Sequence, residues 1–329
     1  MSFFIRTLKN NAAYSVSLLL TISVWSAWFF YTYPDGWFII QKHWQISVSM
    51  VFGSIIAGAT SEGGGAIAFP VFTKILHIPP SDAKVFSLAI QSVGMVAASI
   101  AILMMRIQVL WRVIAWVSFG GIIGMLIGAI GLSALLTPDF IRMLFTVMAV
   151  SLAVTLTFLN TGFRLNNTTI PRIKYQEAAI LLAAGVLGGV MSGLVGSGID
   201  MVCFSVLVLL FRINESIATP TSVILMAIHS IFGVLLHLFV LDGINAQVQA
   251  YWLAAVPIVV VGAPLGAFFC SRMQHLHIRY LLITLIFVEL LSSLWLLTFD
   301  TELLIFSVSM LMLFLSLTVW MSRVTFYRV

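Results

Sequence analysis

The sequence predicts an all-α polytopic membrane protein with two inverted repeats, each containing a glycine-broken re-entrant helix pair, and one extra helix at each end. Three observations predict this class: an apolar composition, a series of long apolar segments, and an internal repeat. Of 329 residues, 61% are hydrophobic and 8% are charged, and the mean hydropathy is +1.12. The 16 Lys and Arg and 11 Asp and Glu are too few to cover a 36.2 kDa protein with hydrated groups. Lipid must cover most of its surface, which excludes a soluble enzyme.

The charged residues and cysteines exclude several other classes. The net charge is +5, but the basic residues are scattered singly between apolar runs, so nucleic acid is not an expected partner. Cys203 and Cys270 match no CxxC or His-spaced pattern, and there is no nucleotide-binding loop. We therefore expect no metal site and no cofactor.

Eight apolar runs are long enough to cross a bilayer, which takes about 20 residues. They lie near 12–32, 84–105, 110–136, 139–160, 215–240, 248–271, 277–298 and 301–321. The first run follows Arg6 and Lys9 and is followed by large aromatic residues instead of a small-residue cleavage site. It is therefore expected to be a retained helix and not a removed signal peptide.

Two further apolar segments, 45–77 and 177–211, are too long for one ordinary span and have glycines in the middle. We expect both to be broken helices. The polar stretch between the halves marks the natural boundary. The expected division is an N-terminal helix and loop at 1–44, repeat 1 at 45–160, a linker at 161–176, repeat 2 at 177–298, and a C-terminal helix at 299–329.

The internal repeat appears when the chain is shifted against itself. At a shift of 135 residues, Gly58 falls on Gly193 and Ile78 on Ile213; at 138, Gly128 falls on Gly266. The repeat unit runs from 53 to 147 and again from 188 to 284, and chance coincidence is disfavoured because the order holds over the whole unit.

The Lys and Arg positions predict that the two repeats are upside down relative to each other. If each broken segment enters and leaves on one side, 12 basic residues lie inside and 4 outside. Each repeat then has three full crossings, an odd number, so the second repeat is inverted. Both termini are then cytoplasmic, and a bacterial inner membrane, that is a plasma membrane, is the expected location.

Each predicted break carries a glycine-rich motif. The first reads Gly58-Ala-Thr-Ser-Glu-Gly-Gly-Gly65 and is followed by Pro70, and the second reads Gly193-Leu-Val-Gly-Ser-Gly-Ile-Asp200. Non-helical backbone at membrane depth is tolerated where protein or a water-filled cavity satisfies its polar groups, so the breaks should face each other inside the protein. The alternative is that these glycines only permit close helix packing.

These motifs, together with the two-fold repeat over about 53–298, resemble the sulfite exporter TauE/SafE family, also called the toluene sulfonate uptake permease family. The resemblance implies a membrane permease for a small organosulfur or related anion, such as sulfite, a sulfonate or a small carboxylate. The sequence departs from the pattern in the second copy, where Ser205 stands in place of the counterpart of Pro70 and Asp200 in place of that of Gly65.

A helix that restarts after a break presents unpaired N–H groups and the positive end of its dipole, which favour an anion. The restarted helices are expected to begin near Ala66 and Met201. With no Lys or Arg at either break, backbone N–H groups and hydroxyls would contact the anion. The expected substrate-binding residues are Thr60, Ser61, Gly63, Gly64, Gly65, Gly196, Ser197 and Gly198.

Three acids, Glu62, Asp200 and Glu289, are predicted to lie at membrane depth, where an ionisable residue is a functional candidate. A carboxylate beside an anion site suggests coupling of transport to H⁺ or Na⁺ through Glu62 or Asp200, although either could instead cap a half-helix. His229 is a further ion-coupling candidate, with a helix-to-helix hydrogen bond as its alternative.

The other polar residues within the apolar segments are expected to have structural roles, or their roles are left undecided by the sequence. Glu289 could be a buried hydrogen-bonding group or a proton relay, and His237 is a weaker candidate than His229. Lys74, near a predicted helix end, is expected to extend to the lipid headgroups.

Two rival functions remain open. An anion channel or the membrane subunit of a larger assembly could also use paired re-entrant segments. An intramembrane protease is disfavoured, since the pattern around Ser197 lacks the glycine two residues earlier, where Val195 stands, and proteolysis leaves the repeat unexplained. The exact anion, the direction of transport and the choice between monomer and homo-oligomer are not specified by the sequence.

Overall fold

The computed structural model describes residues 2–60, 71–158, 167–170, 173–297 and 299–324. Within these ranges the secondary structure is helical, apart from one isolated bridge between Asn167 and Ile213. The N-terminal half contains α1 (Ser2–Thr32), α2 (Gly36–Lys42), α3 (Trp44–Ala59), the π-helical turn η1 (Val71–Ile75), α5 (Pro80–Met104), α6 (Trp111–Leu126), η2 (Ile127–Leu132) and α7 (Pro138–Phe158). The C-terminal half contains α8 (Tyr175–Val195), α9 (Ile199–Ser205), η3 (Val206–Leu210), α10 (Glu215–Phe239), α11 (Ala246–Cys270), α12 (His275–Leu296) and α13 (Thr301–Arg323).

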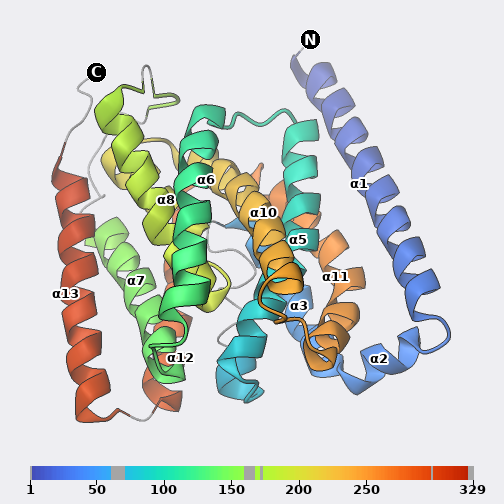
Figure 1. The fold of residues 1–329 in the computed structure, drawn as a ribbon. Helices are drawn as coiled ribbons and strands as arrows, with labels where there is room; N and C mark the ends of the chain where they lie inside the picture. The colour runs from blue at the N-terminus through green and yellow to red at the C-terminus, as the bar shows by residue number, and fades with distance from the viewer. Residues whose placement is uncertain (1, 61–70, 159–166, 171–172, 298, 325–329) are drawn as a thin grey trace.

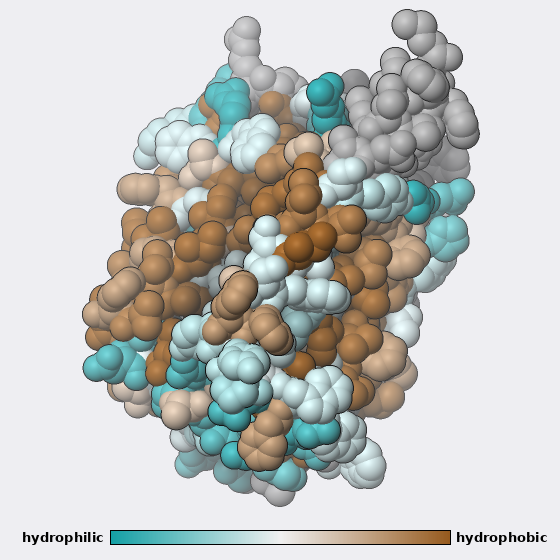
Figure 2. All heavy atoms as spheres, turned by 90° about the vertical axis from the view of Figure 1, so that its right-hand side faces the viewer, coloured by the Kyte–Doolittle hydropathy of each residue, from teal (hydrophilic) through white to brown (hydrophobic). Residues whose placement is uncertain are grey.

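The prediction of an all-helical membrane protein is confirmed. Eight helices in the described ranges are long and apolar enough to cross a membrane. They include α8, which spans 21 residues on its own, although the sequence treats it as part of a broken segment. Figure 2 shows apolar residues over the middle of one face and hydrophilic residues gathered mainly at its lower end, as expected for a bilayer-spanning protein. The short helix α2 was not predicted.

Polar residues at the helix starts explain several boundaries. The side chains of Asn214, Asn245 and Asp300 accept hydrogen bonds from backbone N–H groups in the first turns of α10, α11 and α13. At the start of α8, the Glu177 carboxylate accepts the Lys174 N–H at 2.8 Å. These caps lie at the ends of apolar runs, which is why the predicted spans match the observed helices within a few residues at most ends.

The two halves pack crosswise. Helix α3 of the first half lies against α11 of the second, and α6 of the first half lies against α8 of the second. The central pair α5 and α10 joins the halves directly. The extra helices lie on opposite flanks of the bundle. Helix α1 packs against α5 and α11, whereas α13 packs against α7. Both termini lie at the same end of the bundle (Figure 1).

Glycines bring the crosswise helices into backbone contact. A Cβ atom on Gly58 would clash with the backbone of Ala263 and Ala267, so α3 approaches α11 closely. Gly193 of α8 faces Met125 and Ala129 in the same way. The two sets of contacts are related by the shifts of 135 and 138 residues seen in the sequence. We name these two contacts the glycine seams.

The backbone also repeats with a shift of 135 residues. The turns η1 and η3 correspond at this shift, and each is followed by a residue with positive φ, His77 at 52° and Arg212 at 56°. The N–H groups of Ile78 and Ile213 each donate to the carbonyl six residues earlier, both at 2.9 Å. The repeat found in the sequence is therefore also a repeat of local structure.

The described ends of each broken segment lie close together. Beyond η3, Ile213 is bridged to Asn167, which precedes α8. In the first half, the rings of His43, before α3, and Phe72, in η1, lie 5.2 Å and 6.4 Å from the ring of Tyr251. The chain therefore turns back between α8 and α9, and in the first half η1 lies near the residues that precede α3.

Candidate functional site

The second glycine-rich break lies between α8 and α9, where the sequence places it. Gly196 has φ of +89° and Gly198 has φ of +133°, conformations that side chains rarely adopt. The helix restarts at Ile199, two residues before the predicted start near Met201. Glycine at both positions is therefore what allows the reversal.

The N–H groups at the start of α9 already have acceptors. Asp200 Oδ1 accepts from the N–H groups of Gly198 at 3.1 Å and Met201 at 3.0 Å, and Ser192 Oγ accepts from Ile199 N–H at 3.1 Å. The Asp200 carboxylate thus caps α9, which was one of its two expected roles. An anion could use the amides of Gly198 and Met201 only after this carboxylate moves away.

Two side chains of α5 hold the break from the other half of the protein. Gln91 Nε2 donates to the Gly196 carbonyl at 2.9 Å and to Ser87 Oγ at 2.9 Å, and Ser87 Oγ donates to the same carbonyl at 3.3 Å. Neither residue was predicted as a site residue from the sequence. The available signal was a lone amide side chain inside an apolar span, which is costly without a polar partner.

Several buried side-chain oxygen atoms lie at the Gly196–Gly198 break. Ser197 and Asp200 are fully buried and Gln91 is nearly so. Within the described part of the chain, Ser197 Oγ, Asp200 Oδ2 and Gln91 Oε1 have no hydrogen-bond partner. A carboxylate, an amide carbonyl and a hydroxyl are acceptors that can hold a proton or a small cation.

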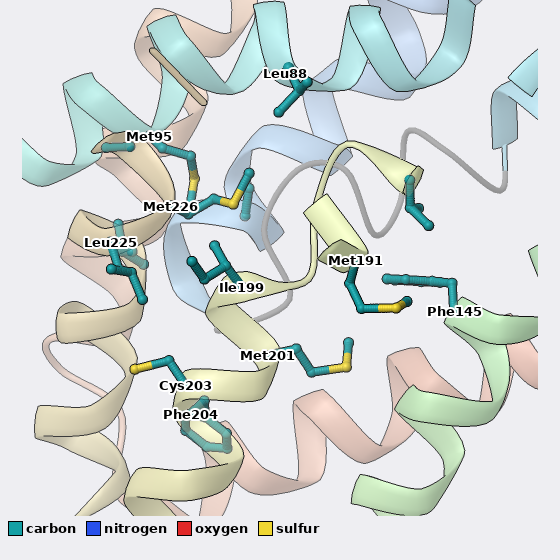
Figure 3. Packing of buried hydrophobic residues seen from close by; sticks show 14 of the residues in the cluster. Leu88, Met95, Phe145, Met191, Ile199, Met201, Cys203, Phe204, Leu225 and Met226 are labelled. Carbon is teal, nitrogen blue, oxygen red and sulfur yellow. The ribbon is translucent and has the colours of Figure 1, made fainter. Parts of the chain in front are cut away.

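Apolar side chains surround this polar break. Residues from α5, α7, α8 and α10, among them Leu88, Phe145, Met191 and Met226, lie around α9 (Figure 3). The surroundings exclude water from Asp200 on several sides, so its carboxyl group depends on the protein for hydrogen bonds.

His229 of α10 lies beside the break. Its Nδ1 is 2.9 Å from the Leu225 carbonyl, and the space above Gly121 is filled by His229 Nε2 together with Ile199 Cδ1. No hydrogen bond joins His229 to Ser197 among those of the described residues, so the arrangement does not form the serine–histidine dyad of a protease. His237 lies near the C-terminal end of α10, against Gly243.

The first break is described only at its start. Thr60 is fully buried and ends α3, with its N–H and Oγ1 both donating to the Ile56 carbonyl at 2.9 Å and 3.0 Å. The predicted site residues Ser61, Glu62, Gly63, Gly64 and Gly65, and the expected restart at Ala66, lie outside the described residues.

A buried ion pair joins η1 to α12. Lys74 Nζ lies 2.7 Å from Glu289 Oε1 and 2.7 Å from Ser293 Oγ. Thr146 of α7 donates to the same carboxylate oxygen at 2.9 Å. Lys74 is only 5% exposed, so the expectation that it extends to the headgroups is wrong, because a carboxylate is within reach in the interior.

A cavity of about 210 Å³ lies beside this ion pair. It is lined by Thr73, Lys74, His77, Arg142 and Leu297, among others. Three of the seven lining residues are of basic types, in a protein with few charged residues overall. The cavity lies where η1 ends and α7 begins, a separate place from the Gly196–Gly198 break.

Comparison with protein families gives one match. The family described as Sulfite exporter TauE/SafE matches residues 46–292, which is most of the chain and contains both predicted breaks, the Lys74–Glu289 ion pair and the cavity lining apart from Leu297. Searches among curated proteins and among solved structures found no match.

Proposed function

Because the chain belongs to the sulfite exporter TauE/SafE family, we propose that it is a secondary-active permease for a small organosulfur or related anion. As a member of a transporter family with eight membrane-span-capable helices in its described part, it is a multi-pass membrane protein whose substrates are small anions of the sulfite type. Within this class we propose sulfite, a sulfonate or a small carboxylate as substrate, transported with H⁺ or Na⁺.

The observation that carries the proposal is the repeated, crosswise architecture around a buried break. The described ends of each broken segment lie close together, and α5, α6 and α7 in the first half correspond to α10, α11 and α12 in the second. We propose that each of these helices crosses the membrane, which would make the two repeats inverted, the architecture in which transporters bind substrate near the bilayer midplane. With both termini at one end (Figure 1), we propose that this end is cytoplasmic in a bacterial inner membrane.

We place the substrate between the two breaks, in contact with Thr60, Ser61, Gly63, Gly64, Gly65, Gly196, Ser197 and Gly198. The Asp200 carboxylate currently accepts two amide N–H groups at the start of α9. A substrate oxyanion is a chemically similar acceptor and could replace the carboxylate there. Such a replacement would leave Asp200 free to take a proton or a small cation.

Replacement of the Asp200 carboxylate by the substrate would couple substrate binding to the binding of an ion. In a low-dielectric interior, an anion and an unpaired carboxylate repel strongly, so substrate binding favours protonation of the carboxylate or entry of a cation. We propose Asp200, Glu62 and His229 as the ion-coupling residues, with Asp200 supported by its burial and its acceptor oxygens.

The test is transport by purified protein in proteoliposomes, using labelled sulfite, taurine, methanesulfonate and acetate with and without a pH gradient. Saturable uptake of at least one of these solutes, accelerated by the gradient, supports the carrier. Unitary currents in a planar bilayer without saturation would instead identify a channel. In the same assay, Glu62→Gln should weaken the pH dependence, and an unchanged profile would remove Glu62 from the coupling.

A further inference from the structure

We propose that the cavity beside Lys74 is a second binding site for a small oxyanion, and that Glu289 gives up Lys74 and takes a proton when the anion binds. The inference rests on the proposed permease function and adds a site at one end of the bundle, apart from the Gly196–Gly198 break.

The size of the cavity and the charge of its lining suit a small oxyanion. The cavity of about 210 Å³ exceeds the roughly 30 Å³ that one water occupies in the liquid several-fold, so it has room for a solute such as a sulfonate. Arg142 and Lys74, which is paired with Glu289, contribute positive charge to its lining, and His77 lies exposed at its edge. Leu297 gives it an apolar wall, which suits the carbon substituent of an organic anion.

The hydrogen-bond donors of Arg142 are only partly used within the protein. Arg142 Nη1 pairs with Asp139 at 2.6 Å, and Nη2 donates to the Thr73 carbonyl at 3.3 Å. Arg142 Nε is buried and has no hydrogen-bond partner in the described part of the chain. Asp139 is 42% exposed at its side chain, so water can hydrate it when Arg142 turns toward a bound anion.

Lys74 connects the cavity with a buried carboxylate. It both lines the cavity and pairs with Glu289, so an anion in the cavity competes with Glu289 for the ammonium group. The charged groups facing Glu289 are Lys74 from η1 and, beyond it, Arg142 from α7. Helix α10 also packs on α12, but none of the Glu289 hydrogen bonds in the described ranges comes from it.

Charge balance then requires a proton. The two cations and the carboxylates of Asp139 and Glu289 cancel, so a bound monoanion adds one uncompensated negative charge near the protein interior. One proton taken from hydronium or a buffer acid in the bulk solution, whose conjugate base stays there, is placed on Glu289 and restores the balance. The anion replaces the carboxylate at Lys74, no covalent bond other than the O–H bond forms, and Lys74 stays charged.

The surroundings of Glu289 can hold the neutral acid. Thr146 Oγ1 lies 2.9 Å and Ser293 Oγ 3.3 Å from Oε1, and these hydroxyls lie 2.7 Å from each other. Hydroxyls can donate or accept, so they can bond either the carboxylate or the carboxylic acid by reorienting. Proton uptake thus leaves no buried group without a partner.

The test measures uptake kinetics in proteoliposomes and anion binding by calorimetry of the purified full chain, with sulfite and methanesulfonate as probes. Buffers of different ionisation enthalpy report the protons taken up per anion. Wild type should show a proton-linked binding component. Glu289→Gln should bind the anion without proton uptake, and Lys74→Gln should lose that component and raise KM by at least about tenfold, the loss of a charge-assisted contact.

Two further variants distinguish the loss of the anion site from a loss of folding. Lys74→Gln/Glu289→Gln keeps a hydrogen-bonding pair without an unpaired buried carboxylate, and it should fold yet lack the proton-linked component. Lys42→Gln removes an exposed lysine from α2 and should behave as wild type. The inference is overturned if the folded double variant keeps wild-type KM and proton linkage.

The outcome distinguishes the two proposals. If wild type transports an anion and the Lys74 variants transport it equally well, the second site is wrong and the permease stands. If wild type neither binds nor transports any of the four solutes named above, the permease proposal fails, and the second site falls with it.

Discussion

Gln91 Nε2 donates a 2.9 Å hydrogen bond to the carbonyl oxygen of Gly196, a residue in the other half of the protein. The side chain enters from α5 and reaches the point where α8 ends. A break in the second half is therefore held by a helix of the first half, so the geometry of the site depends on contact between the halves.

Replacing Gln91 should disturb the break more than the fold. Gln91→Met keeps the length of the side chain and matches Met226, its counterpart at the shift of 135, but leaves the Gly196 carbonyl with only the longer bond from Ser87. We expect a loss of stability of about 1–3 kcal/mol, the usual cost of a poorly satisfied buried polar group, and slower transport. Thermal melting in detergent and proteoliposome uptake measure the two effects, with the exposed Gln41→Met as control. Equal melting and uptake for both variants would contradict a role for Gln91.

Gly196→Ala should be strongly destabilising. At φ of +89° an alanine is strained by roughly 1–2 kcal/mol, and its Cβ would also crowd the Lys84 carbonyl and the Ser87 side chain. Gly131→Ala is the matched control, since a Cβ there meets nothing within 4 Å. A lower melting temperature for Gly196→Ala alone is the expected result. Equal melting of the two variants would argue against the left-handed turn.

The glycine seams should respond alike in both halves. Gly58→Val and Gly193→Val each place side-chain atoms against the backbone of the facing helix, at positions related by the repeat. Both should separate their helix pairs and reduce the yield of folded protein, by costs of at least about 1–3 kcal/mol as for other overpacked sites. Fluorescence-detected size exclusion after mild heating compares them with Gly131→Val. A large effect from one seam and none from the other would break the proposed equivalence.

Asp200→Asn should separate capping from coupling. The amide oxygen of asparagine can still accept the N–H groups of Gly198 and Met201, so the fold should persist. It cannot exchange a proton, so uptake that rises as the external pH falls in wild type should become nearly independent of pH. Uptake rates across a pH series measure this, with the exposed Asp242→Asn as control. A wild-type pH profile in Asp200→Asn would leave Asp200 with the capping role alone.

The helices were predictable because apolar length is a direct consequence of bilayer thickness. The runs at 215–240 and 248–271 became α10 and α11 with ends shifted by at most two residues, since Asn214 and Asn245 cap them. The break at Gly196–Gly198 was also predictable, because only glycine adopts its two positive φ angles without strain.

The partners of the break were not predictable from one chain. The bond from Gln91 to Gly196 and the ion pair of Lys74 with Glu289 join residues 105 and 215 positions apart, and their pairing depends on how the helices cross. Lys74 was misassigned because helix-end lysines usually reach the headgroups, a local rule that ignores a carboxylate on a distant helix.

The crosswise seams also constrain how the chain can be made. The close-packing faces of α3 and α6 are covered by α11 and α8, which leave the ribosome later. While only the first half has been inserted, those glycine faces have no backbone surface to meet, and lipid tails or insertion factors must cover them in the meantime. Maturation of the N-terminal helices therefore waits for the translation of residues up to Cys270.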